Sequence, residues 1–222
     1  MPVIANKAIN THEKVRNLQN RLYLTAKADR KRKFYALYDK IYRKDILEDA
    51  WRRVKRNKGA GGVDKVSIDD VKAYGEDRLL CEIAEELRTE KYRCKPVRRT
   101  YIPKPDGRKR ALGIPTIKDR IVQMAAKIVI EPVFEADFQP CSYGFRPKRS
   151  AKQAMDRIFE VADKGGALWV IDADIRDYFG SINHDKLLLL VKQRITDRRV
   201  LKLILQALSG IIGRKELVGG VS

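Results

Sequence analysis

The sequence has few of the residues that build disulfide bonds or metal sites. It contains three cysteines and two histidines among 222 residues, and Cys81, Cys94 and Cys141 form no C-x-x-C pair. An odd number of widely spaced cysteines argues against a disulfide framework and a structural zinc site, and it fits a reducing cytoplasm. We expect His12 and His184 to be ordinary polar residues.

Long apolar segments are also absent. No run approaches the roughly 20 residues that cross a bilayer, and residues 1–7 hold too short an apolar stretch for a signal peptide. We therefore expect a cytoplasmic protein with no membrane partner. Hydrophobic residues still make up 44% of the chain, which is enough for a substantial core in one or two domains.

Acidic residues are outnumbered. The chain has 29 Asp and Glu against 48 Lys and Arg, which gives a net charge of +19. Such an excess suits a polyanionic partner, because neutralised phosphates release counterions and so drive nucleic-acid binding. Ribosomal-type binding or an anionic membrane surface would also fit, so charge alone names no activity.

Apolar residues at helical spacing predict several helices across residues 11–58. Basic residues follow the same segment, both between two of these helices and along the third. A charge run is usually a solvated face, but basic residues beside aromatics on successive helices favour RNA contact. The predicted RNA-binding residues are Arg30, Lys31, Arg32, Lys33, Arg52, Arg53, Lys55 and Arg56.

Residues 59–62 (GAGG) break the helical pattern. They lack the Lys and Ser/Thr of a nucleotide P-loop, so we predict a flexible turn. Ser67 followed by Asp70 predicts a capping box at the start of a helix, which explains the acidic pair Asp69–Asp70 without a catalytic role. A second helix follows, with an apolar face that includes Leu80, Ile83 and Leu87.

Residues 98–114 predict a β-hairpin around a Pro-Asp-Gly turn. Its tip is rich in cations, namely Lys104, Arg108, Lys109 and Arg110. Lysines on an edge strand can simply discourage aggregation. Cations at a hairpin tip are also what a triphosphate clamp requires, because arginine forms a bidentate fork and lysine supplies a point charge.

Further helices are predicted at 117–138, 150–162, 183–194 and 197–212, with residues 142–147 as a loop. Pro132 predicts a kink, or a second short helix, in the first of these. In residues 169–179 (WVIDADIRDYF), the alternation over 169–174 predicts a strand that places Asp172 and Asp174 on one face. A carboxylate at the end of a strand suits Mg²⁺, which prefers oxygen ligands, although an isolated D-x-D is more often a solvated acidic face.

Three blocks occur in one order: residues 99–123 (RTYIPKPDGRKRALGIPTIKDRIVQ), 142–150 (SYGFRPKRS) and 169–179. With residues 57–64 (NKGAGGVD), they resemble the N-terminal part of bacterial group II intron-encoded reverse transcriptases, or maturases. The resemblance implies an α+β fold, the right-hand polymerase fingers with an incomplete palm. It assigns 1–58 to a basic helical N-terminal extension, 59–166 to the fingers and 167–222 to the first part of the palm.

The resemblance also implies roles for matching positions. Asp174 corresponds to the first palm carboxylate that binds catalytic Mg²⁺, with the backbone carbonyl of Ile175 as a further ligand, while Asp172 stays structural. Phe179 matches an aromatic gate that rejects a ribose 2′-hydroxyl. The other matches are Lys104 and Arg110 for the dNTP triphosphate, Ile114 beside the templating base pair, and Arg120 and Arg146 as primer-template or structural arginines.

These roles imply an RNA-directed DNA polymerase, a nucleotidyltransferase that uses two Mg²⁺ ions, dNTPs, and an RNA template with a DNA primer. Group II intron RNA is the implied partner. The sequence departs from the family because no Y-x-D-D motif follows Asp174, and because Asp177 and Gly180 replace a usual glycine and aspartate.

We therefore expect a truncated polymerase that needs a complementing C-terminal segment and is inactive by itself. The alternative is an inactive RNA-binding maturase module that assists intron splicing. A general basic nucleic-acid protein would leave the hairpin and the acidic segment unexplained. The oligomeric state stays open.

Overall fold

The computed structural model describes residues 2–103, 107, 109–165, 169–175 and 178–212. Within them the chain is mostly helical, with one two-stranded sheet. The elements are α1 (Pro2–Ala28), α2 (Tyr38–Ile41), α3 (Lys44–Asn57), α4 (Ile68–Tyr74), α5 (Glu76–Arg88), β1 (Arg98–Pro103), β2 (Lys109–Ile114), α6 (Ile117–Glu135), α7 (Ala151–Gly165), α8 (Tyr178–Ser181), α9 (His184–Lys192) and α10 (Arg198–Ile212). No helix in these ranges is long and apolar enough to cross a membrane.

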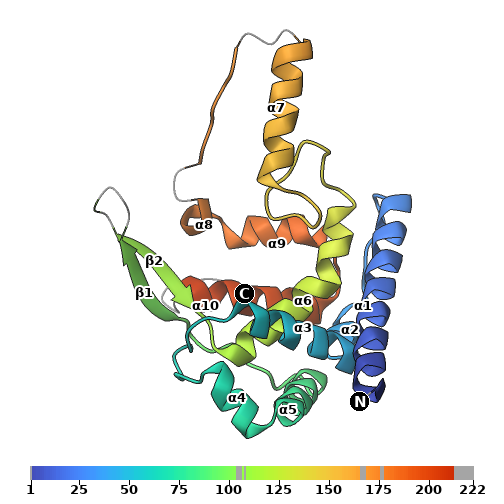
Figure 1. Cartoon of the computed structure of the whole chain (residues 1–222), viewed down its shortest axis with the longest axis vertical. Coiled ribbons are helices and arrows are strands. Elements are labelled where there is room, and N and C mark those ends of the chain that lie inside the picture. The colour runs from blue at the N-terminus through green and yellow to red at the C-terminus, as the bar shows by residue number, and fades with distance from the viewer. Residues whose placement is uncertain (1, 104–106, 108, 166–168, 176–177, 213–222) are drawn as a thin grey trace, which may run out of the picture.

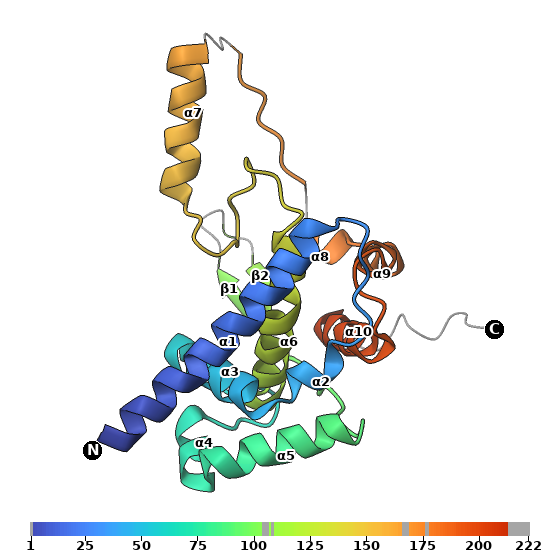
Figure 2. The same cartoon turned by 90° about the vertical axis from the view of Figure 1, so that its right-hand side faces the viewer.

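The core is built around α6, which packs against α1 and α3 (Figure 2). The predicted apolar stripe is confirmed, because Ile121, Ala125, Ile128 and Val129 are all buried. Met124 of the same stripe is only partly buried. Burying a Val or Ile side chain contributes about 1.5–3 kcal/mol, so the buried face of α6 contributes substantially to tertiary stability.

Helix α6 runs through Pro132 without interruption, so the second short helix is wrong. A proline has no N–H to donate to the carbonyl four residues before it, which here is Ile128. That carbonyl accepts a 3.0 Å hydrogen bond from Nε2 of Gln19 in α1. The neighbouring helix thus replaces the donor that the proline lacks.

Several local predictions are confirmed. Ser67 and Asp70 form a reciprocal capping box at the start of α4, and α5 buries Leu80, Ile83 and Leu87. The hairpin is present, and helices α9 and α10 lie where the apolar spacing predicted them. Residues 59–62 form no helix or strand.

Helix α7 and residues 169–175 extend away from the helical body (Figures 1 and 2). No side chain of α7 is buried, and Ile158 and Phe159 are 57% and 65% exposed. The predicted strand at 169–174 is wrong, because residues 169–175 form no strand and Trp169 and Ile171 are more than 90% exposed. A strand needs a neighbour for its backbone N–H and C=O groups, and the described part of the chain pairs none with this segment.

Candidate functional site

The hairpin carries the residues predicted to hold a triphosphate. Strands β1 and β2 pair antiparallel in the register Arg98–Ile114 to Pro103–Lys109. This register places Arg110 opposite Ile102, close to the tip, and Ile114 at the base, where its side chain is partly buried. Lys104 and Arg108, and the side chain of Arg110, lie outside the described residues. Lys109 is exposed.

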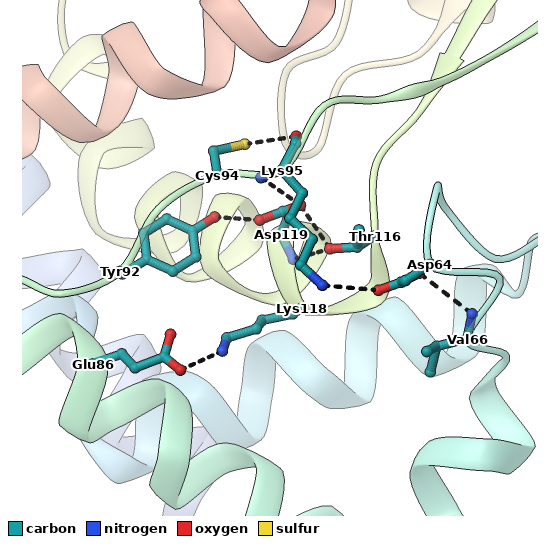
Figure 3. A network of polar contacts seen from close by, with 9 residues as sticks. All are labelled: Asp64, Val66, Glu86, Tyr92, Cys94, Lys95, Thr116, Lys118 and Asp119. Atoms are coloured by element: carbon teal, nitrogen blue, oxygen red, sulfur yellow. Dashed lines mark hydrogen bonds and ion pairs between the residues drawn. The ribbon is translucent and has the colours of Figure 1, made fainter.

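Both legs of the hairpin are attached at their base to one buried carboxylate, Asp119, which is 1% exposed (Figure 3). Asp119 accepts hydrogen bonds from the Thr116 hydroxyl at 2.6 Å, just after β2, and from the Lys95 N–H at 3.3 Å, just before β1. The Tyr92 hydroxyl donates a third, at 2.6 Å. Thr116 also caps α6 by accepting from the Asp119 N–H. The direction of the hairpin is therefore fixed by the first turn of α6.

Ion pairs near this buried group join its neighbours to α5 and to the segment before α4. Lys118 Nζ lies 2.5 Å from Glu86 in α5, and Lys95 Nζ lies 3.9 Å from Asp64 (Figure 3). Each pair joins segments that are distant in sequence. Because these side chains are partly exposed, we expect each pair to contribute at most about 1 kcal/mol.

The environment of Asp119 perturbs two neighbouring groups. Burial and the Asp119 charge raise the pKa of Tyr92 far above its ordinary value, so the phenol stays protonated and donates. Burial, followed by the same negative charge, raises the pKa of the Cys94 thiol to about 11. Both shifts keep the phenol and the thiol in their neutral forms.

The glycine-rich turn packs against the start of α6. A Cβ on Gly62 would lie 2.6 Å from the backbone of Thr116, so only glycine fits this close approach. Arg120, which was predicted as a primer-template or structural residue, donates from Nε to the Pro115 carbonyl at 3.1 Å and from its guanidinium to the Ala60 carbonyl. Its side chain therefore connects residues 59–62 to the end of the hairpin.

Arg146, like Arg120, was predicted as a primer-template or structural arginine, and its side chain contacts other residues of the protein. Its guanidinium lies 2.6 Å from Glu135 at the end of α6 and donates to the carbonyls of Gln139 and Ser142 at 2.8 and 2.7 Å. It also lies over the ring of Phe138. These contacts tie the loop after α6 to the end of that helix.

Asp174 lies in the exposed segment between α7 and α8. Asp172, Asp174 and Ile175 are all exposed, and the side chain of Phe179 is outside the described part of the chain. Three or more acidic, histidine or cysteine side chains that could share a metal ion are not found together among the described residues. The described residues therefore do not by themselves complete a Mg²⁺ site.

The predicted RNA-binding residues fall into two groups. Arg52 and Arg53 both contact the buried carboxylate of Asp49, with Arg53 Nε at 2.8 Å, and Lys55 pairs with Glu76 at 2.8 Å. These three cations share two carboxylates, although Arg52 is itself exposed. Arg56 and the four residues Arg30, Lys31, Arg32 and Lys33 are exposed.

Sequence reasoning missed the buried polar residues Asp49, Asp119, Arg194 and Asp197. Thr116 followed by Asp119 is a capping signature, which could have pointed to the second of these. Asp49 precedes its partners Arg52 and Arg53 by three and four residues, a helical ion-pair spacing that could have pointed to it. The main partners of Arg194 and Asp197 lie about 160 residues away in sequence, so these two residues had no local signal.

Residues 102–219 match the family model described as reverse transcriptase (RNA-dependent DNA polymerase), over half of the chain. The chain is 36% identical to the protein YkfC of Escherichia coli over 86% of the chain and 51% of that protein. It is also 36% identical to the group II intron-encoded protein LtrA of Lactococcus lactis, over 77% of the chain and 28% of LtrA. The Arabidopsis thaliana protein named "Nuclear intron maturase 1, mitochondrial" is 31% identical over 40% of the chain. The chain thus spans about half, or less, of the length of these relatives.

Proposed function

The chain belongs to the reverse transcriptase family, in its group II intron-encoded branch, and we propose that it supplies the fingers and first palm segment of an RNA-directed DNA polymerase. The family implies a reverse transcriptase polymerase fold, nucleic-acid substrates and, in general, the use of Mg²⁺. One observation supports the proposal most directly: the hairpin with its cationic tip is attached by both legs to a buried carboxylate in α6.

The proposed organisation follows the order of the chain. Residues 1–58 are a basic helical extension that binds RNA, 59–166 are fingers, and 167–222 begin the palm. The helical body of α1, α3 and α6 gives the hairpin a rigid base, which is what accurate placement of a triphosphate requires.

Within this organisation Lys104 and Arg110 bind the triphosphate of the incoming dNTP, and Ile114 packs beside the templating base pair. Arg110 lies opposite Ile102, near the hairpin tip. Phe179 excludes the 2′-hydroxyl. Cations here act by neutralising and positioning phosphates rather than by covalent chemistry.

Asp174 and the carbonyl of Ile175 remain proposed ligand positions for Mg²⁺. The exposure of Asp174 leaves its carboxylate oxygens open to a cation or to another polypeptide. We propose that a complementing segment, equivalent to the part of the relatives that this chain does not cover, supplies the remaining ligands and the strands beside residues 169–175.

The test is a chimera in which this chain replaces the aligned part of LtrA. The chimera should extend a DNA primer on an RNA template with dNTPs and Mg²⁺. Asp174→Asn should lower that rate at least about a hundredfold, because a two-metal site that loses one ligand loses most of its activity. Asp172→Asn is the matched control and should retain activity. A folded chimera that does not extend the primer, or that survives Asp174→Asn, would contradict the proposal.

A second candidate function is an RNA-binding maturase module without polymerase activity. It is favoured by the net charge of +19 and by the exposed cations at 30–33, since neither depends on a metal site. It is distinguished by a chimera that binds intron RNA and assists splicing but does not extend the primer.

A further inference from the structure

Arg194, between α9 and α10, is a buried cation beneath the basic residues 30–33. Its side chain is only 6% exposed. The guanidinium donates to the carbonyls of Ala26 at 2.9 Å, Asp29 at 3.1 Å and Arg32 at 3.2 Å, and also to the carbonyl of Arg30. Asp137 lies 2.9 Å from Nε, in an ion pair that is poorly aligned for a hydrogen bond. The Arg194 side chain therefore donates hydrogen bonds to backbone carbonyls of the last turn of α1 and of the loop that follows it.

The exit of this loop is held by the neighbours of Arg194. The Phe34 N–H donates to the Arg194 carbonyl at 2.8 Å, and the Thr196 N–H donates to the Phe34 carbonyl at 2.9 Å. Asp197 then accepts from the N–H groups of Leu37 and Tyr38, both at 2.9 Å. The backbone from residue 26 to residue 38 is thus fixed on residues 194–197.

The outer side of the same loop carries mainly charged side chains and one aromatic ring. The four basic side chains at 30–33 are exposed, and Tyr35 beside them is 78% exposed. With the carbonyls turned inward to a buried cation, the loop presents concentrated positive charge to solvent. A phosphate backbone relieves that charge, and an unpaired base can stack on an exposed tyrosine.

We propose that Arg194 is a positioning residue that holds residues 30–33 in the shape that binds RNA phosphates. The proposal rests on the proposed RNA binding of this loop and adds a residue distant in sequence that organises it. A loop backbone that is already ordered before binding avoids the entropy cost of ordering that backbone when RNA binds.

The experiment measures binding of the full chain to a structured group II intron RNA at several salt concentrations. Arg194→Met should lower the affinity about tenfold, with a nearly unchanged salt slope, because all four surface cations remain. Arg194→Lys keeps the net charge but loses the planar set of donors, so it should bind almost as weakly as Arg194→Met. Circular dichroism and urea unfolding confirm that the variants compared are folded. A folded Arg194→Met chain with unchanged affinity would overturn the proposal.

A second pair of variants does not threaten the fold, because Asp29 is exposed. The Lys31 N–H donates to Asp29 Oδ1 at 2.8 Å. Asp29→Gly and Asp29→Asn remove the same negative charge, but only the asparagine keeps an acceptor for that N–H. We expect Asp29→Gly to bind RNA several-fold more weakly than Asp29→Asn. Equal affinities of the two variants would overturn the idea that loop shape matters.

Alanine at all four positions 30–33 tests the proposed RNA binding of the loop separately from the role of Arg194. If that variant binds RNA as tightly as the wild type, the RNA-binding assignment of the loop fails and the role of Arg194 falls with it. If the alanine variant loses affinity while Arg194→Met does not, only the role of Arg194 is refuted.

Discussion

Tyr92 donates a 2.6 Å hydrogen bond to Asp119, 27 residues further along the chain, and both side chains are buried. The phenol thereby joins the segment that enters β1 to the first turn of α6. Thr116 and the Lys95 N–H contact the same carboxylate from the two legs of the hairpin. Asp119 is consequently the point through which the hairpin is attached to the core.

Tyr92→Phe tests that attachment. The substitution keeps the ring but leaves Asp119 with one donor fewer, which should lower the free energy of unfolding by about 1–3 kcal/mol. Urea unfolding measures the difference. Tyr35→Phe is the matched control and should cost under about 0.5 kcal/mol, because Tyr35 is 78% exposed. Equal costs for the two variants would contradict a special role for the Tyr92 hydroxyl.

The thiols provide a chemical test of the same region. A shift of the Cys94 pKa from 9.0 to about 11 lowers its thiolate fraction at pH 8 about a hundredfold. Iodoacetamide should therefore modify Cys94 far more slowly than the exposed Cys81 and Cys141, as followed by peptide mass spectrometry. Asp119→Asn should accelerate the reaction at Cys94, because it removes a negative charge that raises that pKa. A Cys94 that reacts as fast as Cys141 in the folded protein would be inconsistent with this environment.

Asp197 predicts an acid dependence of stability. Burial alone would raise its pKa, but hydrogen bonds from the N–H groups of Tyr38, Leu37 and Arg199, and the Arg199 charge, hold it below the ordinary 3.8. The folded-state pKa is thus depressed, so the stabilisation is complete above about pH 5 and is lost as the pH falls through the folded value.

We expect Asp197→Asn to cost about 1–3 kcal/mol at pH 6 and distinctly less at pH 3, measured by urea unfolding. Asp39→Asn, at an exposed aspartate, should show a small difference at both pH values. A cost for Asp197→Asn that does not change with pH would rule out this linkage.

The two groups of basic residues should behave differently toward RNA. Alanine at Arg30, Lys31, Arg32 and Lys33 should weaken binding and reduce the salt slope by roughly one unit per lost phosphate contact. Arg53→Met should instead lower stability, by up to about 3–5 kcal/mol, because it removes a partner of the buried Asp49. Filter binding over a salt series and urea unfolding measure the two effects. If the slope does not change, residues 30–33 are a solvated face.

Local chemistry was predictable wherever the partners lie close together in sequence. The capping box of Ser67 and Asp70, the Pro-Asp-Gly hairpin and the apolar face of α5 depend on spacings of a few residues. The sequence also indicated the family, because its motifs are contiguous blocks. Long-range attachments could not be predicted this way. No residue near Pro132 in sequence indicates that Gln19 donates the hydrogen bond that the Ile128 carbonyl would otherwise lack.

The error at residues 169–174 has a related cause. Alternation of apolar and acidic residues predicts which face of a strand is buried, but it does not supply the neighbouring strand. The candidate site was only partly accessible from the sequence. The roles of Asp174 and Arg110 come from the resemblance and stay predictions, whereas Tyr92 and Lys95, which help to attach the hairpin, lie 27 and 24 residues from Asp119.

The dependence of the basic loop on Arg194 and Asp197 also sets an order of events during synthesis. A ribosome makes residues 26–38 first, and the side chains that fix them are separated by up to 168 residues of sequence. The loop consequently stays without its final shape while most of the polypeptide is being translated. Nascent chains should acquire tight RNA affinity late, in a single step, once residues 194–197 have left the exit tunnel.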